Sequence, residues 1–201
     1  SAASFNEIEE IRFAGANQTA TFTSGQLTGE ALQLNETATG TSNLVITVGS
    51  GETATFATMT AGTFTSGSDT LTINANTGNE TITGPNIATT INAGTGNDTI
   101  TGGTANDVIS GDAGNDTIDG GDGADSLVGG AGNDLYLFNT NDVDAGETIT
   151  EAASGGTDVV SIVTTTDFAN MSAASFNEIE EIRFAGANQT ATFTSEQLVS
   201  E

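Results

Sequence analysis

The chain has 201 residues, which is enough to bury a core, and a formal net charge of −25 from 27 acidic and two basic residues. This charge argues against nucleic acid or an anionic membrane surface as a partner, because both require Lys and Arg. The absence of His and Cys excludes a catalytic triad, a thiol nucleophile, the usual zinc sites and a disulfide. Hard oxygen ligands remain, and these suit calcium.

The first 24 residues, SAASFNEIEEIRFAGANQTATFTS, recur without a mismatch at positions 172–195, an offset of 171 residues. Identity of this length predicts a tandem array. We expect residues 1–24 to end a preceding repeat, 25–195 to form one complete repeat, and 196–201 to begin the next. No signal peptide or membrane span is visible in the sequence.

In chain order, residues 25–74 are predicted to form solenoid rungs. Short alternating or β-prone stretches, separated by turns, lie at 19–23, 32–34, 44–48, 53–56, 63–65 and 71–73. The alternation in Thr19-Ala20-Thr21-Phe22-Thr23 is typical of a half-buried strand.

Residues 75–137 divide into seven consecutive nonapeptides: ANTGNETIT, GPNIATTIN, AGTGNDTIT, GGTANDVIS, GDAGNDTID, GGDGADSLV and GGAGNDLYL. The eighth position is always large and apolar, and the sixth is Asp in the last five units: Asp98, Asp107, Asp116, Asp125 and Asp134. The Gly-rich start tolerates tight turning, and the triplet that follows favours a strand. Each unit is therefore predicted to form half a coil with one side chain pointing inward, so that like turns stack every second unit.

Residues 138–195 are predicted to continue the rungs, with strands near 149, 159–163, 179, 182–184 and 190–194. Asp142 and Asp144 lie in an acidic turn, and Asp158 follows two glycines and precedes two valines. Either segment could bind a calcium ion or be a plain polar turn. Taken together, the pattern predicts an all-β fold, a parallel β-roll or β-solenoid with calcium-binding turns, continuous along the chain.

The nonapeptides resemble the RTX calcium-binding family, whose motif is G-G-x-G-x-D-x-U-x. The resemblance implies calcium between stacked turns, held by two Asp side chains and four backbone carbonyls. The first site would use Asp98 and Asp116 with Gly94, Gly96, Gly111 and Ala113. The second would use Asp107 and Asp125 with Gly103, Ala105, Gly120 and Asp122. The third would use Asp116 and Asp134 with Asp112, Gly114, Gly129 and Ala131.

The first two units depart from the motif. Glu80 replaces Asp and could pair with Asp98, with Asn76 and Gly78 in its turn. Thr89 supplies no charge, and Pro85 and Ile87 replace glycines, so this half-coil is expected to pack without metal. The resemblance implies about three to five calcium ions per repeat.

The resemblance also implies a structural repeat of a giant secreted protein at the cell surface, such as an adhesin stalk, a surface layer or an extracellular filament. It implies type I secretion and folding on external calcium. The expected partners are neighbouring copies end to end, and lateral self-assembly is left open. We expect no enzyme activity, since H-E-x-x-H and G-x-S-x-G are absent. The alternatives are an ice-binding solenoid, through its Thr rows, and the non-catalytic portion of a secreted RTX enzyme.

Overall fold

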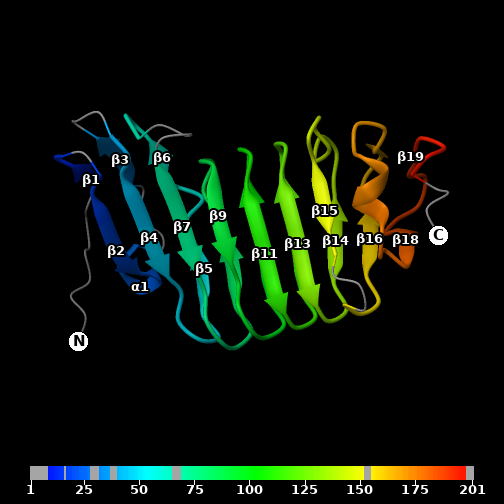
Figure 1. Cartoon of the computed structure of the whole chain (residues 1–201), viewed down its shortest axis with the longest axis horizontal. Coiled ribbons are helices and arrows are strands. Elements are labelled where there is room, and N and C mark those ends of the chain that lie inside the picture. Colours follow the sequence, from blue (N-terminus) through cyan, green and yellow to red (C-terminus); the bar gives the residue numbers. More distant parts are fainter. Residues whose placement is uncertain are drawn as a thin grey trace.

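The computed structural model describes residues 9–15, 17–27, 32–36, 40–64, 69–151 and 155–197. Its strands cross the long axis of the molecule and stack one behind another along it (Figure 1). β1 (Glu10–Phe13) and β2 (Thr19–Thr23) lie at one end, and β18 (Glu181–Phe184) and β19 (Ala191–Thr192) lie at the other. Neighbouring strands pair in parallel, so the predicted parallel β-solenoid is confirmed.

Two seven-stranded parallel sheets form the body of the molecule. The first large sheet contains β2, β4 (Asn43–Thr47), β7 (Thr70–Asn74), β9 (Thr89–Asn92), β11 (Val108–Ala113), β13 (Ser126–Ala131) and β15 (Thr148–Thr150). The second large sheet contains β5 (Thr53–Thr55), β8 (Thr81–Thr83), β10 (Thr99–Gly103), β12 (Thr117–Gly121), β14 (Leu135–Phe138), β16 (Val159–Ile162) and β18. Successive strands alternate between the two sheets through the nonapeptide row, as expected if each unit is half a coil.

Smaller sheets and short helices occupy the two ends. β1 pairs with β3 (Gln33–Glu36), which pairs with β6 (Thr60–Ala61), and β17 (Thr166–Asp167) pairs with β19. The helical turns are α1 (Ser24–Leu27) and the 3₁₀ helix η1 (Ala173–Phe176). Within the described ranges, no helix is long and apolar enough to cross a membrane.

Coil length differs between the middle and the ends of the molecule. In the nonapeptide row Ile82, Ile100 and Ile118 are paired neighbours, which gives a coil of 18 residues. Toward the ends, hydrogen-bonded neighbours lie 22 to 29 residues apart. The middle is therefore a thin roll, and the larger coils at the ends enclose a wider interior.

The core follows this difference in coil length. In the thin roll, each unit buries its eighth residue: Ile82, Ile91, Ile100, Ile109, Ile118, Leu127 and Tyr136 are at most 1% exposed. The wider C-terminal coils hold an aromatic cluster in which Phe168 packs edge-on to Phe138 and Phe176 and stacks on Phe193. One buried side chain contributes roughly 1.5–3 kcal/mol. Ordering nine residues costs about 1–2 kcal/mol each, so the thin roll needs further stabilisation.

Candidate metal centres in the coil turns

Acidic side chains at the sixth position stack into two columns, one on each edge of the roll. Each main-chain N–H donates to a carboxylate oxygen of the next coil, as from Asp98 N to Asp116 Oδ1 at 2.7 Å and from Asp107 N to Asp125 Oδ1 at 2.8 Å. The first column contains Glu80, Asp98, Asp116, Asp134, Asp158 and Glu180, and the second contains Thr89, Asp107, Asp125 and Glu147. Stacking every second unit thus brings together the predicted Asp pairs.

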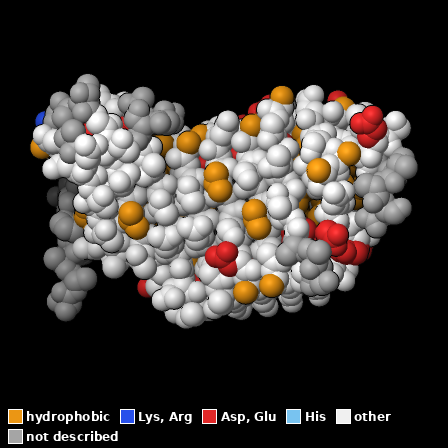
Figure 2. All heavy atoms as spheres, viewed as in Figure 1, with side chains coloured by type: hydrophobic (Ala, Val, Ile, Leu, Met, Phe, Trp, Pro, Cys, Tyr) orange, Lys and Arg blue, Asp and Glu red, His pale blue; other side chains and the backbone are white. Residues whose placement is uncertain are grey.

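In most of these carboxylates the second oxygen is buried and has no partner among the described residues. These atoms are Glu80 Oε2, Glu147 Oε1 and the Oδ2 atoms of Asp98, Asp107, Asp116, Asp125 and Asp134. Figure 2 accordingly shows only scattered acidic side chains on the face in view, although the chain has 27 of them. A buried charged oxygen without a partner is strongly unfavourable, so each marks a place where a cation would be stabilising.

The pKa values of three of these carboxyls reflect the same unfavourable burial of charge. Burial raises the pKa of Asp107 and of Asp116 to about 7, although the hydrogen bond that each accepts from a main-chain N–H of the preceding coil opposes the shift. Burial raises the pKa of Glu147 further, to about 9, with repulsion from Asp125 adding to it. Without a cation, burial therefore makes these three carboxyls harder to ionise in the folded state, and Glu147 stays protonated at neutral pH.

The turn glycines keep main-chain atoms close to these oxygens. A Cβ at Gly111 would lie 2.4 Å from Asp116 Oδ2, and one at Gly120 would lie 2.3 Å from Asp125 Oδ2. The unpartnered oxygen of each Asp is thus directed over the backbone at the start of its own turn. Such a pocket of carboxylate and carbonyl oxygens is the donor set that calcium prefers, so the residues present fit the ion.

The predicted carbonyl ligands lie in the same turns and already take part in pairing between coils. Gly94 O accepts a hydrogen bond from Ala113 N, and Ala113 O accepts one from Gly96 N. A carbonyl oxygen has two lone pairs, so this bond leaves one for a metal. The equivalent stacking recurs at the other predicted ligands: Gly114 N donates to Ala131 O, Asp112 pairs with Gly130, and Gly121 closely approaches Gly103 O.

In the turns of the first column, close stacking requires glycine at the fourth position. Gly114 has a φ of +146°, and a Cβ there would lie 1.6 Å from Gly96 O. Gly96 is placed in the same way against Gly78 O. A side chain at these positions would therefore push neighbouring coils apart.

A second ladder, formed by Asn at the fifth position, runs beside the carboxylates. The side-chain oxygens of Asn79, Asn97, Asn115 and Asn133 accept from the N–H groups of Asn97, Asn115, Asn133 and Thr157. Here each N–H donates to the preceding coil, whereas in the carboxylate columns it donates to the following coil. This ladder was not predicted from the sequence, although Asn recurs before the acid in most units.

At the start of the row, the departures from the motif have structural counterparts. Glu80 accepts a hydrogen bond from Gly51 N at 2.5 Å, and Asn76 O accepts one from Thr95 N in the stacked turn. The Thr89 hydroxyl donates to Ile87 O, so this position is satisfied within its own turn.

Downstream, the longer coils bury one of the two acids predicted in the acidic turn, leave the other exposed, and add Glu147, which was not predicted from the sequence. Asp142 is buried and accepts from Asn139 N, and its pKa is raised to about 6 by burial, with Asp119 adding to the shift. Asp144 is exposed. Glu147 continues the second column and accepts from Asp125 N at 2.7 Å. A usable signal was present, because Glu147 precedes Thr-Ile-Thr as Glu80 does.

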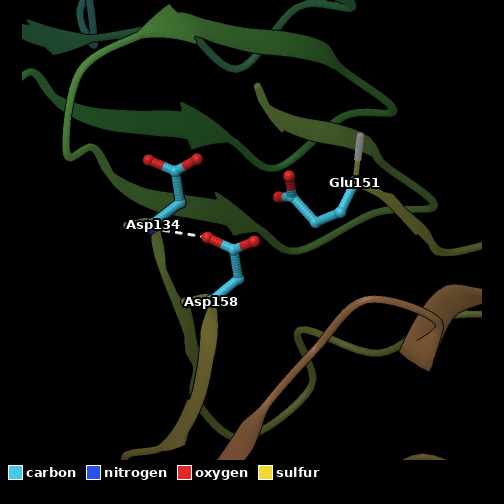
Figure 3. A group of neighbouring side chains, drawn as sticks. All are labelled: Asp134, Glu151 and Asp158. Atoms are coloured by element: carbon cyan, nitrogen blue, oxygen red, sulfur yellow. Dashed lines mark hydrogen bonds between the residues drawn. The ribbon is translucent and has the colours of Figure 1, made fainter. Parts of the chain in front are cut away.

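A further cluster joins Asp134 and Asp158 to Glu151, another residue that the sequence analysis missed. One carboxylate oxygen from each lies within 4.8 Å of the others, and the three side chains point toward one another (Figure 3). Glu151 accepts from the Tyr136 hydroxyl and from Gly129 N at 3.2 Å. A Cβ at Gly129 would lie 2.4 Å from both Asp134 Oδ2 and Glu151 Oε1, so glycine leaves room for this convergence.

Comparison with known proteins agrees with this geometry. Residues 88–118 and 101–136 match the family model of the RTX calcium-binding nonapeptide repeat (4 copies). No curated protein and no solved structure matches the chain. The matched segments contain the five Asp residues at the sixth position, so the resemblance derived from the motif is confirmed.

Proposed function

Because the chain carries RTX calcium-binding nonapeptide repeats, we propose that it is a calcium-stabilised, non-catalytic structural module of an extracellular protein. The observation that carries this proposal is the pair of carboxylate columns, in which a buried oxygen recurs without a partner. Calcium supplies the missing positive charge. The module would then form part of a stalk, surface layer or filament at the cell surface.

Six candidate calcium positions follow from the two columns and from the neighbouring cluster at Asp134. Asp98 with Asp116, Asp107 with Asp125, and Asp116 with Asp134 would hold three ions, together with the turn carbonyls named above. Glu147 with Asp125 offers a fourth, and the cluster of Asp134, Glu151 and Asp158 offers a fifth. Glu80 with Asp98 repeats the arrangement at the start of the row.

In this proposal calcium acts as a folding switch. At low calcium, the net charge of −25 and the buried carboxylates oppose a compact state. A ligand that binds only the folded state stabilises it by mass action, so millimolar external calcium would fold the chain after type I secretion. The thin hydrophobic core of the nonapeptide row is too small to fold the chain by itself.

A calcium titration followed by circular dichroism tests the proposal. We expect the metal-stripped chain at pH 7.5 to gain β-sheet signal with calcium and to lose it again with chelator. Magnesium serves as the matched control, because it requires a tighter octahedral shell and retains its waters. Equal β-sheet signal and equal thermal stability with and without calcium would overturn the proposal.

An ice-binding surface is the second candidate, and rows of Thr on the second large sheet favour it. Thr53, Thr81, Thr99 and Thr117 are in register, and Thr55, Thr83 and Thr101 form a parallel row. Leu135 follows Thr117 in the first row and Asp119 follows Thr101 in the second, so the flat Thr surface covers only a few coils. Thermal hysteresis measured with calcium, for the chain and for Thr99→Lys, tests this candidate. Activity that the substitution abolishes would support it, and no activity would refute it.

A further inference from the structure

The duplicated block has different environments in its two copies. Phe13 of the first copy is 3% exposed, whereas Phe184, the same residue of the second copy, is 50% exposed. Likewise, Ser24 is buried, whereas Ser195, its counterpart in the second copy, is exposed. The two copies lie at opposite ends of the molecule (Figure 1). Each copy therefore shows what the block contacts on one side only.

The first copy shows the contacts with the coil that follows it. β1 pairs with β3 from Glu10–Gln33 to Phe13–Glu36, and β2 pairs with β4 from Thr19–Asn43 to Thr23–Thr47. Phe13 lies 5.9 Å from Phe64, centroid to centroid. Asn35 Nδ2 donates to Glu10 at 2.7 Å, and Asn17 Oδ1 accepts from Thr41 N at 3.1 Å.

The second copy shows the contacts with the coil that precedes it. β18 pairs with β16, and β19 pairs with β17. Phe193 stacks on Phe168 at 4.9 Å. Gln197 Nε2 donates to Phe168 O at 2.6 Å and to Met171 O at 2.8 Å, and Gln189 Nε2 donates to Val163 O.

These two sets of contacts use opposite edges of the same strands. In the first copy, Glu9 O and Gln18 O accept from the following coil. In the second copy, Ala185 N donates to the preceding coil and Thr192 O accepts from it. In the first copy, the counterparts of Ala185 and Thr192 are Ala14 and Thr21. Ala14 is an odd number of residues from Glu9 in the first strand, and Thr21 is an odd number of residues from Gln18 in the second. Alternate residues of a strand present their main-chain groups to opposite edges, so the two sets do not compete.

Two local hydrogen bonds recur in both copies, in the block and just beyond its end, although β2 spans five residues and β19 spans two. Gly15 N donates to Gln18 Oε1 at 3.1 Å, and Gly186 N donates to Gln189 Oε1 at 2.9 Å. Thr23 N donates to Gln26 Oε1, and Thr194 N donates to Gln197 Oε1. A single block can therefore hold the forward and the backward contacts at once.

We propose that residues 172–195 form a joint whose free edge binds the next repeat of the same protein. This proposal rests on the proposed role of the chain as a repeat module. In the joint, β18 pairs with the next repeat's counterpart of β3, and β19 pairs with its counterpart of β4. The register is the one in which β1 pairs with β3 and β2 pairs with β4 here. The counterpart of Phe64 covers Phe184.

This joint passes each sheet on to a different sheet. The second large sheet, which ends at β18, continues into the next copy's small sheet of β1, β3 and β6. The small sheet of β17 and β19 continues into the next copy's first large sheet. Sheets therefore cross the boundary between repeats, and the boundary contains no hinge.

Single-cysteine labelling tests the joint, because the chain has no Cys of its own. Phe184→Cys is placed in the 201-residue chain and in a two-copy chain in which residues 25–201 follow Ser195. Both are labelled with a thiol reagent at saturating calcium, and labelling is read by mass spectrometry. Val108→Cys, at a position that is also 50% exposed, is the matched control.

We expect Cys at position 184 to react like the control in the 201-residue chain, and at least about tenfold more slowly in the two-copy chain. Amide exchange of the unsubstituted two-copy chain gives a second reading, with residues 180–193 slower at the inner joint than at the terminal one. Equal labelling and equal exchange at both joints would overturn the proposal. Repeating the measurements without calcium separates it from the proposed function. If calcium proves irrelevant to folding, the inner joint will still label and exchange more slowly than the terminal one. If the joint alone is wrong, the gain of β-sheet signal with calcium will remain.

Discussion

Asp116→Asn should change stability in opposite directions with and without calcium. Asn keeps an acceptor for Asp98 N, but it replaces the buried, unpartnered Oδ2 with a neutral group. In the metal-free folded state, burial raises the pKa of Asp116 from 3.8 to about 7. At pH 7.5 this shift of about three pKa units opposes folding by roughly 4 kcal/mol, and the substitution removes the cost.

Part of that gain is offset, because the new amide is a buried donor without a partner and costs about 1–3 kcal/mol. The net metal-free stabilisation is then on the order of 1–3 kcal/mol. With calcium the sign reverses, because Asp116 would serve two ions. Each ion at a hundred times its dissociation constant contributes about 2.7 kcal/mol, so we expect a loss of roughly 3 kcal/mol or more.

Circular dichroism reads both effects. With calcium, urea unfolding gives the loss; without it, the pH at which the metal-stripped chain loses half its β-sheet signal should rise for Asp116→Asn. Asp122→Asn is the matched control, because it makes the same charge change at an exposed position of a neighbouring turn. If Asp116→Asn destabilised the metal-free chain as well, the carboxylate would be stabilising through protein contacts, and the reasoning would fail.

Three further predictions concern the same turns. Because the folded-state pKa values of Asp107 and Glu147 are raised, their protonated forms fold without penalty at low pH; the metal-free chain should therefore lose stability as pH rises from about 4 through about 7 to 9, while calcium-loaded protein should not. A pH series of thermal melts checks this, and a metal-free chain most stable at high pH would contradict it. Gly114→Ala should lower stability in calcium by roughly 2 kcal/mol or more, because its Cβ would meet Gly96 O. Gly25→Ala, where the Cβ meets nothing within 4 Å, should be neutral or slightly stabilising, and equal melting temperatures for the two variants would count against the close stacking. Glu151→Gln should reduce the number of ions bound in calorimetry by one and leave the β-sheet signal intact; an unchanged stoichiometry would remove the cluster at Asp134 from the metal sites.

The regular part of this molecule could be predicted because one spacing determines it. A nine-residue period forces each sixth and eighth residue into the same place in every second unit, so the buried Ile row and the Asp columns follow directly from the sequence. The stacking of Asp98 on Asp116 depends on nothing outside the row.

The flanks could not be predicted in the same way, since their coils have no fixed length. Between Asp125 and its partner the offset grows to 22 residues, and between Asp134 and Asp158 it grows to 24. Once the period is lost, spacing no longer says which of Asp142, Asp144 and Glu147 faces the column. Glu151 lies outside any nonapeptide, and only the folded coil brings it to Asp134.

The strands of this molecule lie across its long axis, so the hydrogen bonds between coils run along that axis (Figure 1). We therefore expect tension applied to the two ends to load the terminal coil first and to peel the chain away one coil at a time. In the nonapeptide row every coil has 18 residues, and each would release about 60 Å of chain. A tether built from such units would lengthen under load one coil at a time, in equal steps through the nonapeptide row and in longer steps in the flanks, and would shorten again as each coil rewound around its ions.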